Sequence, residues 1–273
     1  MAEQEQWYAA RADYQTLGQA IASDTEAYGG HLNKARELTK RAVDSSVRAN
    51  SPENGARWEA IAAQREAAFG YSAQARQRAA EALKLAPANQ MAQSHAALAL
   101  AMAGETARAE SLAQDLQKRF PLDTQMQVLW LPAIYAQLAL DRKKPASTLG
   151  TPQAALPIEL GTSQFVNNLS CLYHVYVRGE AYLANGQGTA AAAEFQKILD
   201  HSGIVWNCWT GALARLGVAR ANAVQARTLH GADAVAASAR SRAAYEEFLT
   251  LWKDADPDLP ILKAAKAEYT KLQ

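Results

Sequence analysis

The feature that most constrains the fold is a spacing of 34 residues between rare residue types. Gly70 and Gly104 are 34 positions apart, and Pro87 and Pro121 are separated by the same distance. The chain has only 15 glycines and 9 prolines in 273 residues, so this shared offset is more informative than matches between its many alanines. The spacing therefore predicts a structural unit that repeats along the chain.

Each unit is expected to contain a helix, a glycine turn, a second helix and a proline. Residues 56–69 and 73–86 are the predicted helices of one unit, with Gly70 between them and Pro87 after them. Glycine accepts the positive φ of such a turn, and proline cannot continue a helix. A period of 34 residues is that of the tetratricopeptide repeat (TPR). We therefore expect an all-α fold, namely a TPR-type α-solenoid in which antiparallel helix hairpins form a right-handed superhelix.

Further copies of the unit extend this interpretation to the whole chain, as a single superhelical domain over residues 1–273. Pro145, Gly150, Pro152 and Pro157 make the fourth copy irregular, because they interrupt its second helix. The last copy carries a long insertion, so its two helices should be longer and should be joined around residues 230–233. The expected repeats are 16–49, 56–89, 90–123, 124–160, 172–205 and 211–256, followed by a terminal capping helix over 260–272.

The clearest copy of the repeat pattern lies between residues 172 and 205. Gly179 and Tyr182 match the small-residue and aromatic part of the first helix, Gly186 is the expected turn, and Ala191 with Phe195 matches the second helix. In this pattern small residues lie where two helices cross, and aromatic side chains fill the space between them. One such hairpin cannot bury its apolar face alone, so we expect neighbouring hairpins to stack.

Three stretches carry a more specific resemblance: TEAYGGHLNKARELTKRAV, VYVRGEAYLANGQGTAAAAEFQKILDHSGIV and FLTLWKDADPDLPILKAAKAEYTKLQ. They resemble the C-terminal TPR region of acidobacterial eukaryotic-like serine/threonine protein kinases. The resemblance covers roughly residues 20–273 and implies a TPR array in bacterial signalling that handles protein ligands. It leaves the compartment open, because a soluble segment of this kind can be the cytoplasmic or extracytoplasmic part of a membrane-anchored protein.

The motifs of several enzyme classes do not occur in the sequence. There is no His-Arg-Asp, Asp-Phe-Gly or kinase glycine-rich loop, so kinase activity is not carried over from the resemblance. The sequence GQGTAA at residues 186–191 has the residue pattern of a dinucleotide-binding motif. It follows a predicted helix and not a strand, so we do not expect it to bind a dinucleotide. We expect no catalysis and no cofactor. A net charge of +1 without a clustered basic face argues against binding to nucleic acid. The sequence has no apolar run long enough to predict insertion into a membrane.

Two groups of residues have both a functional and a structural interpretation. Cys171, His174, His201 and Cys208 could ligate a metal, but their spacing matches no known finger, so buried thiols and hydrogen-bonded histidines are the expected outcome and no metal is predicted. Trp206 and Trp209 flank Cys208. Core packing is the default for large aromatics, although an exposed pair could anchor a partner.

A ligand-binding groove is predicted on the first helices of the hairpins, which line the concave face of such arrays. The helical register selects aromatic, methionine and aliphatic positions with few charges, as suits a peptide with apolar anchors. We therefore expect a non-catalytic scaffold that binds a protein or peptide. The alternative is a self-associating structural module, a homo-oligomer formed through an edge of the solenoid or the terminal helix. The predicted groove residues are Met91, Ser94, Leu98, Met102, Gln125, Val128, Tyr135, Tyr173, Tyr176 and Glu180.

Overall fold

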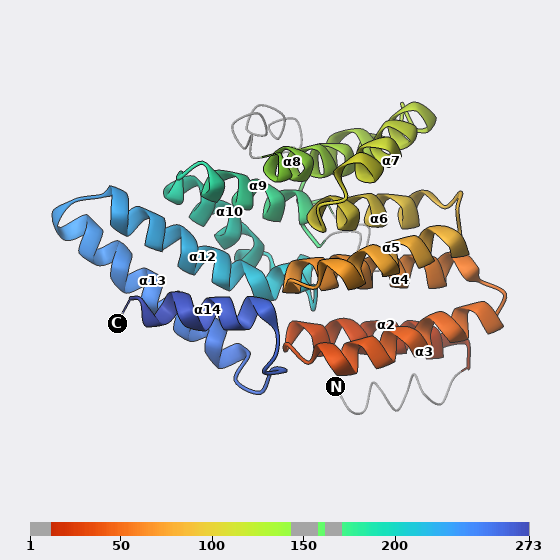
Figure 1. Cartoon of the computed structure of the whole chain (residues 1–273), viewed down its shortest axis with the longest axis horizontal. Coiled ribbons are helices and arrows are strands. Elements are labelled where there is room, and N and C mark those ends of the chain that lie inside the picture. The colour runs from red at the N-terminus through yellow and green to blue at the C-terminus, as the bar shows by residue number, and fades with distance from the viewer. Residues whose placement is uncertain (1–11, 143–157, 162–170, 273) are drawn as a thin grey trace. The chain divides into compact units, whose positions relative to one another are not determined.

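A computed structural model describes residues 12–142, 158–161 and 171–272, and the regular secondary structure in these ranges is helical throughout (Figure 1). The predicted all-α fold is therefore confirmed for the part of the chain that the structure describes. Packing contacts divide the chain into two units, Met1–Arg119 and Phe120–Gln273. Each unit has its own packed helices, and a continuous superhelix through both stays a prediction.

Unit 1 consists of consecutive helical hairpins. Each predicted repeat between residues 16 and 123 contains two helices, and the first and second helices of each pair pack against one another. In chain order the described helices are α2 (Ala12–Tyr28), α3 (Leu32–Arg48), α4 (Pro52–Phe69), α5 (Ser72–Leu85), α6 (Gln90–Met102) and α7 (Thr106–Arg119).

Glycines make the turns within the hairpins of unit 1, as the spacing predicted. Gly70 follows the last residue of α4 with φ 98°, a left-handed conformation, and its N–H donates to the carbonyl of Ala67 at 3.1 Å. Gly104 makes the same turn after α6 with φ 78°. Because a side chain is strained at such φ values, the two glycines are required where a helix must stop and the chain must reverse.

Helix α4 is buried on most of its surface because it packs against α3, α5 and α6. Its small residues Ala60 and Ala63 are fully buried and let the neighbouring helices approach closely. Its polar residues are buried as well. Arg65 forms an ion pair with Asp24 of α2, and it donates a hydrogen bond to Thr39 of α3 at 2.7 Å. Charged side chains therefore lie at the contacts between helices in unit 1, where they must be paired to be tolerated.

Unit 2 contains a less regular series of helices. The stretch that makes repeat 124–160 irregular, with Pro145, Gly150, Pro152 and Pro157, lies outside the described residues. Helices α12 and α13 have 20 and 21 residues and are joined in the stretch where the sequence predicts the connection. No helix in the described ranges of either unit is long and apolar enough to cross a bilayer. The helices of unit 2 are η1 (Met126–Trp130), α8 (Leu131–Asp141), α9 (Tyr173–Ala184), α10 (Gly188–Asp200), α11 (Ser202–Val205), α12 (Trp209–Thr228), α13 (Gly231–Leu251) and α14 (Pro260–Thr270).

The helix that opens unit 2 contains a π turn. The N–H of Leu131 donates to the carbonyl of Met126, five residues earlier, and Pro132 follows. Proline has no N–H for the carbonyl of Val128, so the helix widens over η1 before it continues as α8. A π turn inserts one residue, so the side chains before it do not continue the α-helical register of those after it. This register change was not part of the sequence expectation for residues 125–139.

The ring of Phe195 on α10 lies against two glycines. A Cβ atom added to Gly179 on α9 would lie 2.8 Å from the ring, and one added to Gly217 on α12 would lie 2.5 Å from it. Real Cβ atoms do not approach this closely, so α9 and α12 can both pack on α10 only because these positions lack side chains. The small-residue and aromatic elements of the sequence pattern therefore have a direct structural role.

Four further aromatic side chains extend the core of unit 2 from Phe195. Ring centroids are separated by 5.5 Å for Tyr176 and Phe195, 4.9 Å for Tyr176 and Trp209, 5.7 Å for Tyr173 and Trp209, and 5.7 Å for Trp130 and Tyr173. These distances are typical of tilted or edge-on aromatic pairs, which stabilise a core beyond the area they bury. Tyr173 and Tyr176 are thus committed to packing.

The interpretation of Cys171 and Cys208 as buried thiols is wrong, because the two residues form a disulfide bond. Cys171 lies just before α9 and Cys208 is the N-cap residue of α12, so the bond joins the starts of two helices 37 positions apart in sequence. The hydroxyl of Thr210 also donates to the carbonyl of Cys171 at 2.6 Å. Neither sulfur is available as a metal ligand in this state.

Adding a methyl group beside Phe195 should destabilise the protein. We expect Gly179→Ala and Gly217→Ala each to lower the free energy of unfolding by about 1–3 kcal/mol, through overpacking against the ring. The sign of the change in unfolding free energy is diagnostic, because Gly→Ala inside an unstrained helix normally stabilises the protein. Urea denaturation gives the measurement. Gly203→Ala on α11, where a Cβ meets open space, is the control and should be neutral or stabilising, and Phe195→Leu should recover part of the loss in Gly217→Ala.

Removing the disulfide should also weaken unit 2. For a closed loop of this length, the double variant Cys171→Ser with Cys208→Ser is expected to lose about 3–4 kcal/mol of unfolding free energy. Wild-type protein held in a reductant should show the same shift of the denaturation midpoint. Thiol titration of the unfolded, unreduced chain should find no reactive thiol, and finding two would contradict the bond.

Candidate functional site

The predicted groove residues of unit 1 are mostly unable to contact a ligand. All four lie on α6. Ser94 and Leu98 are 0% exposed, because this helix is covered by its neighbours on most of its surface. Met91 and Met102 are half-buried near the two ends of the helix. The register placed the four residues on one stripe, but it could not show how much of that stripe the adjacent helices cover.

The predicted groove residues of unit 2 are divided between core and surface. Tyr173 and Tyr176 are buried in the aromatic core, and Val128 and Tyr135 are half-buried. Glu180 is half-buried on α9 and lines a cavity of unit 2. Gln125 is exposed directly before η1. The structure therefore places Glu180, but not the other nine residues, on the wall of a described cavity, and ligand binding by the predicted set stays a prediction.

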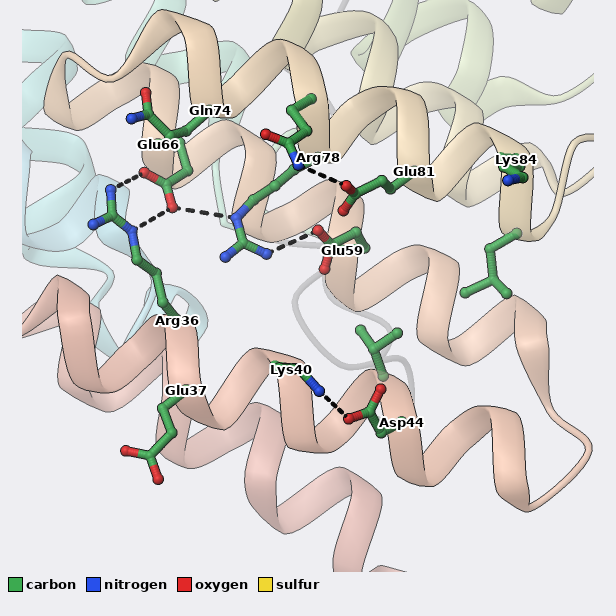
Figure 2. Close-up of a pocket in the computed structure, with 13 residues that line it drawn as sticks. Arg36, Glu37, Lys40, Asp44, Glu59, Glu66, Gln74, Arg78, Glu81 and Lys84 are labelled. Carbon is green, nitrogen blue, oxygen red and sulfur yellow. Dashed lines mark hydrogen bonds and ion pairs between the residues drawn. The ribbon is translucent and has the colours of Figure 1, made fainter.

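Unit 1 has a cavity of about 890 Å³ over α4, between α3 and α5 (Figure 2). Charged side chains dominate its wall. Glu66 at its base accepts two hydrogen bonds from Arg36 of α3, at 2.9 and 2.7 Å, and one from Arg78 of α5 at 3.2 Å. Arg78 also donates to Glu59 at 2.8 Å. Figure 2 shows the Arg78 guanidinium between these two carboxylates.

These charges serve mainly to connect three helices. Burial raises the pKa of the Glu59 carboxyl, against the lowering effect of Arg78. The side chain of Glu66 is almost fully covered, and removing one partner of such a pair leaves an uncompensated charge. Around the rim, Lys40 pairs with Asp44 at 2.7 Å. The acidic residues of this wall thus have partners within unit 1, and their ion pairs connect α3, α4 and α5.

Unit 2 has a second cavity, also of about 890 Å³, built from different elements. Helices α8, α9 and α12 form much of its wall, and each is the first helix of a predicted hairpin. Tyr245 of α13, Glu268 of α14 and the two residues after α14 complete it. Apolar side chains of α8, α9 and α12, together with Leu272, share the lining with six charged side chains. The residues are Gln137, Leu140, Asp141, Glu180, Leu183, Ala184, Arg220, Ala223, Val224, Ala226, Arg227, Tyr245, Glu268, Lys271 and Leu272.

One group of charges in the unit 2 cavity is fully paired. Arg220 of α12 donates two hydrogen bonds to the carboxylate of Glu268 on α14, both at 2.9 Å, in the planar arrangement typical of guanidinium and carboxylate. The hydroxyl of Tyr245 donates to the same carboxylate at 2.8 Å. Burial alone would raise the pKa of Glu268, but the hydrogen bonds and charge of Arg220 hold it below the ordinary value. Glu268 is therefore an anion, and its charge is balanced by that of Arg220.

Two other carboxyls in this cavity are less well compensated. Asp141 is the last residue of α8. One of its oxygens accepts a hydrogen bond from Gln137 at 3.1 Å, while Oδ2 is buried without a hydrogen-bond partner. Burial raises the pKa of Asp141 against the lowering effects of Gln137 and Arg142, and it also raises the pKa of Glu180, where Arg220 opposes the effect and Glu268 adds to it. A carboxylate at the end of a helix is further disfavoured by the helix dipole.

The lining of the unit 2 cavity combines charged and aliphatic side chains and includes no histidine, cysteine, serine or threonine. Its charged groups can attract a ligand, and its aliphatic groups can cover one. Among the described residues, no group of three histidine, cysteine, aspartate or glutamate side chains is placed to hold a metal ion.

The sequence analysis missed Asp141, Arg220, Tyr245 and Glu268. Arg220 and Glu268 are 48 positions apart on different helices, and no local pattern signals that they meet. Asp141 did carry a signal, because it is an acidic residue at the end of the strongly apolar helix LPAIYAQLALD. Trp206 and Trp209 do not form an exposed pair, since Trp206 is 64% exposed while Trp209 is buried.

No protein-family model, curated protein or solved structure matches the chain in the comparisons made with known proteins. The function must therefore be argued from the two cavities. Of these, the unit 2 cavity has carboxyl groups that are incompletely compensated within the protein, and it is the better candidate for a ligand site.

Replacing Asp141 should stabilise the ligand-free protein. Asp141→Asn keeps the hydrogen bond from Gln137 but removes a charge that burial and the helix end disfavour. We expect a gain in unfolding free energy of about 0.3–1 kcal/mol at neutral pH. Because the folded-state pKa of Asp141 is raised, the gain should be present at neutral pH and should disappear as the pH falls and the carboxyl is protonated in both states.

A matched control exists for this substitution. Asp200 is the last residue of α10 and also accepts a hydrogen bond from the glutamine four residues before it, at 2.8 Å, but it is exposed. Asp200→Asn should therefore stabilise less than Asp141→Asn. Equal effects in urea denaturation would show that the helix end, and not burial in the cavity, is responsible.

Proposed function

We propose that this chain is a non-catalytic module that binds a peptide or a segment of another protein through the cavity of unit 2. The observation that carries the proposal is that the first helices of successive hairpins, α8, α9 and α12, share one wall of a cavity of about 890 Å³. The sequence predicted a ligand surface on first helices. Glu180 belongs both to that prediction and to this wall.

The size and lining of the cavity support a binding role. Ligand pockets in proteins typically occupy about 300–1,000 Å³ and combine an apolar surface with a few polar groups. Leu140, Leu183 and Val224 come from three different helices and supply the apolar part. The ion pair Arg220–Glu268 joins α12 to α14 and is formed without a ligand. A preformed site of this kind loses less entropy on binding.

The proposal includes a TPR-like solenoid as the wider architecture. Its support is the 34-residue spacing, the left-handed glycine turns and the packing of Phe195 on Gly179 and Gly217. A role in bacterial signalling is proposed on the sequence resemblance to kinase-associated arrays. The partner is then a protein ligand, in keeping with hairpin arrays that present grooves to extended or helical segments.

Blocking the cavity should abolish peptide binding without disturbing the fold. Ala184 is an exposed lining residue at the end of α9, so Ala184→Trp places a large ring in the opening. We expect peptides selected from a displayed random library on the full chain to lose at least tenfold in affinity for this variant, measured by fluorescence anisotropy.

The control for this experiment is Ala193→Trp, which adds the same ring at an exposed position of α10 outside the cavity. It should leave affinity unchanged, and circular dichroism should show both variants folded. Undiminished binding to Ala184→Trp would exclude the cavity as the site. A library that yields no binding peptide would count against the function itself.

A further inference from the structure

We propose that this chain folds and meets its ligand in an oxidising compartment, outside a reducing cytosol, because the bond between Cys171 and Cys208 completes the junction of α9 and α12. The inference rests on the proposed function and adds the redox condition under which the binding module is complete. The sequence resemblance leaves both sides of a membrane open, and the bond selects between them. The chain has two cysteines, and both are in this bond.

The bond connects two helices that share the wall of the unit 2 cavity. Cys171 precedes α9 and Cys208 is the N-cap residue of α12, with 5.7 Å between their Cα atoms. Further along the same helices, Leu183 of α9 and Val224 of α12 line the cavity. The loop that the bond closes contains α9, α10 and α11. The whole hairpin of α9 and α10 is therefore tied covalently to the start of α12.

The backbone beside each cysteine has a conformation that side chains disfavour. Leu172 follows Cys171 with φ 50° and ψ 39°. Trp206 lies two residues before Cys208, with φ 50° and ψ −118°. In the described ranges three non-glycine residues have positive φ, and these are two of them. Such angles are costly for bulky residues and persist only where the surrounding structure imposes them. The strained backbone on both sides of the bond indicates that the junction is built for bonded cysteines.

The packing around the bond closes it to solvent. Cys171 is 1% exposed and Cys208 is 4% exposed. The buried hydroxyl of Thr210 donates to the carbonyl of Cys171, and the rings of Tyr173 and Trp209 pack across the same junction. A reductant in solution cannot reach the bond unless the junction opens. The bond is therefore a lasting part of the folded state and not a reversible switch at the surface.

Formation of the bond requires an oxidant. The two thiols lose two protons and two electrons, and a disulfide-bearing oxidant takes them up as exchange converts it into two thiols. Disulfides form and persist in extracytoplasmic compartments, whereas glutathione and thioredoxin keep cysteines reduced in the cytosol. A chain that folds in the cytosol would keep Leu172 and Trp206 in strained conformations without the bond that holds them. The folded structure with this bond is thus expected on the oxidising side of a membrane.

The first measurement is the redox state of the two cysteines in the cells that produce the protein. Cells are quenched in acid, and the denatured full chain is treated with a maleimide that adds a fixed mass to each free thiol. We expect no adduct before reduction and two adducts after it. Two adducts without reduction in most of the protein would overturn the inference. This measurement needs no variant, so it does not depend on how well a variant folds.

The second measurement tests whether the bond completes the junction. Hydrogen exchange is followed by mass spectrometry on the oxidised full chain and on the full chain held in a reductant. The N–H of Trp206 donates to the carbonyl of Ser202 at 2.8 Å. The N–H of Cys208 donates to the carbonyl of Val205 at 3.0 Å. Both should exchange at least tenfold faster in the reduced chain, while the N–H of Gly70 in unit 1 should be unaffected. Equal exchange at the junction in both forms would overturn the inference.

Variants separate the loss of the bond from other effects of the reductant. The double variant Cys171→Ser with Cys208→Ser should exchange like the reduced wild type, with and without reductant. If the reductant accelerated exchange in this variant, the effect would not come from the bond and the inference would fall. Trp206→Gly accepts the positive φ without strain, so reduction should accelerate exchange at its junction less than in wild type. Gly203→Ala, where a Cβ meets open space, is the matched control and should respond like wild type.

The inference and the proposed function can fail separately. Peptides that bind through the cavity of a chain whose cysteines are reduced in its cells would overturn the inference and leave the proposed function standing. A library that yields no peptide would remove the proposed function and, with it, the ligand that the inference places in the oxidising compartment.

Discussion

The ring of Phe195 lies against the backbone of two helices, and most of unit 2 depends on that contact. Gly179 on α9 and Gly217 on α12 provide the space that the ring occupies. Glu180 follows the first of these glycines directly, and Arg220 comes one helical turn after the second. The distance between the two cavity walls that carry these charges is therefore set by a hydrophobic contact in the core. The chemistry of the cavity depends on close packing, which tolerates little change in volume.

The two cavities contain similar charged residues, but these residues are paired to different degrees. In unit 1, Arg36 and Arg78 share the carboxylates of Glu66 and Glu59 so completely that the charges hold helices together. In unit 2, the pair Arg220–Glu268 does the same for α12 and α14. Asp141 is different, because it ends an aliphatic helix and one of its oxygens is buried without a hydrogen-bond partner. An incompletely satisfied charge is a cost to stability, and such costs are concentrated at sites that bind something.

The sequence predicted those parts of the structure that depend on neighbouring residues. The turn at Gly70 follows from one residue type at one position, and the contact between Gly179, Gly217 and Phe195 follows from a repeat pattern that places small residues where helices cross. The cavity could not be predicted in this way, because its charged residues come from separate helices. Tyr176 was expected in a groove, yet α9 packs against α8, α10 and α12, and Tyr173 and Tyr176 are buried in the core. The disulfide had no signature either, since a separation of 37 residues between two cysteines matches no motif.

The contact at Phe195 also restricts how such a chain can change during evolution. Arrays of helical hairpins are usually regarded as interchangeable modules that can be duplicated, deleted or reordered. Here the hairpin formed by α9 and α10 requires a glycine at one position of α12. A duplication or deletion at this junction would bring an ordinary side chain against the ring, unless the incoming helix carried glycine at that position. A rearrangement that keeps α9, α10 and α12 together would avoid this clash.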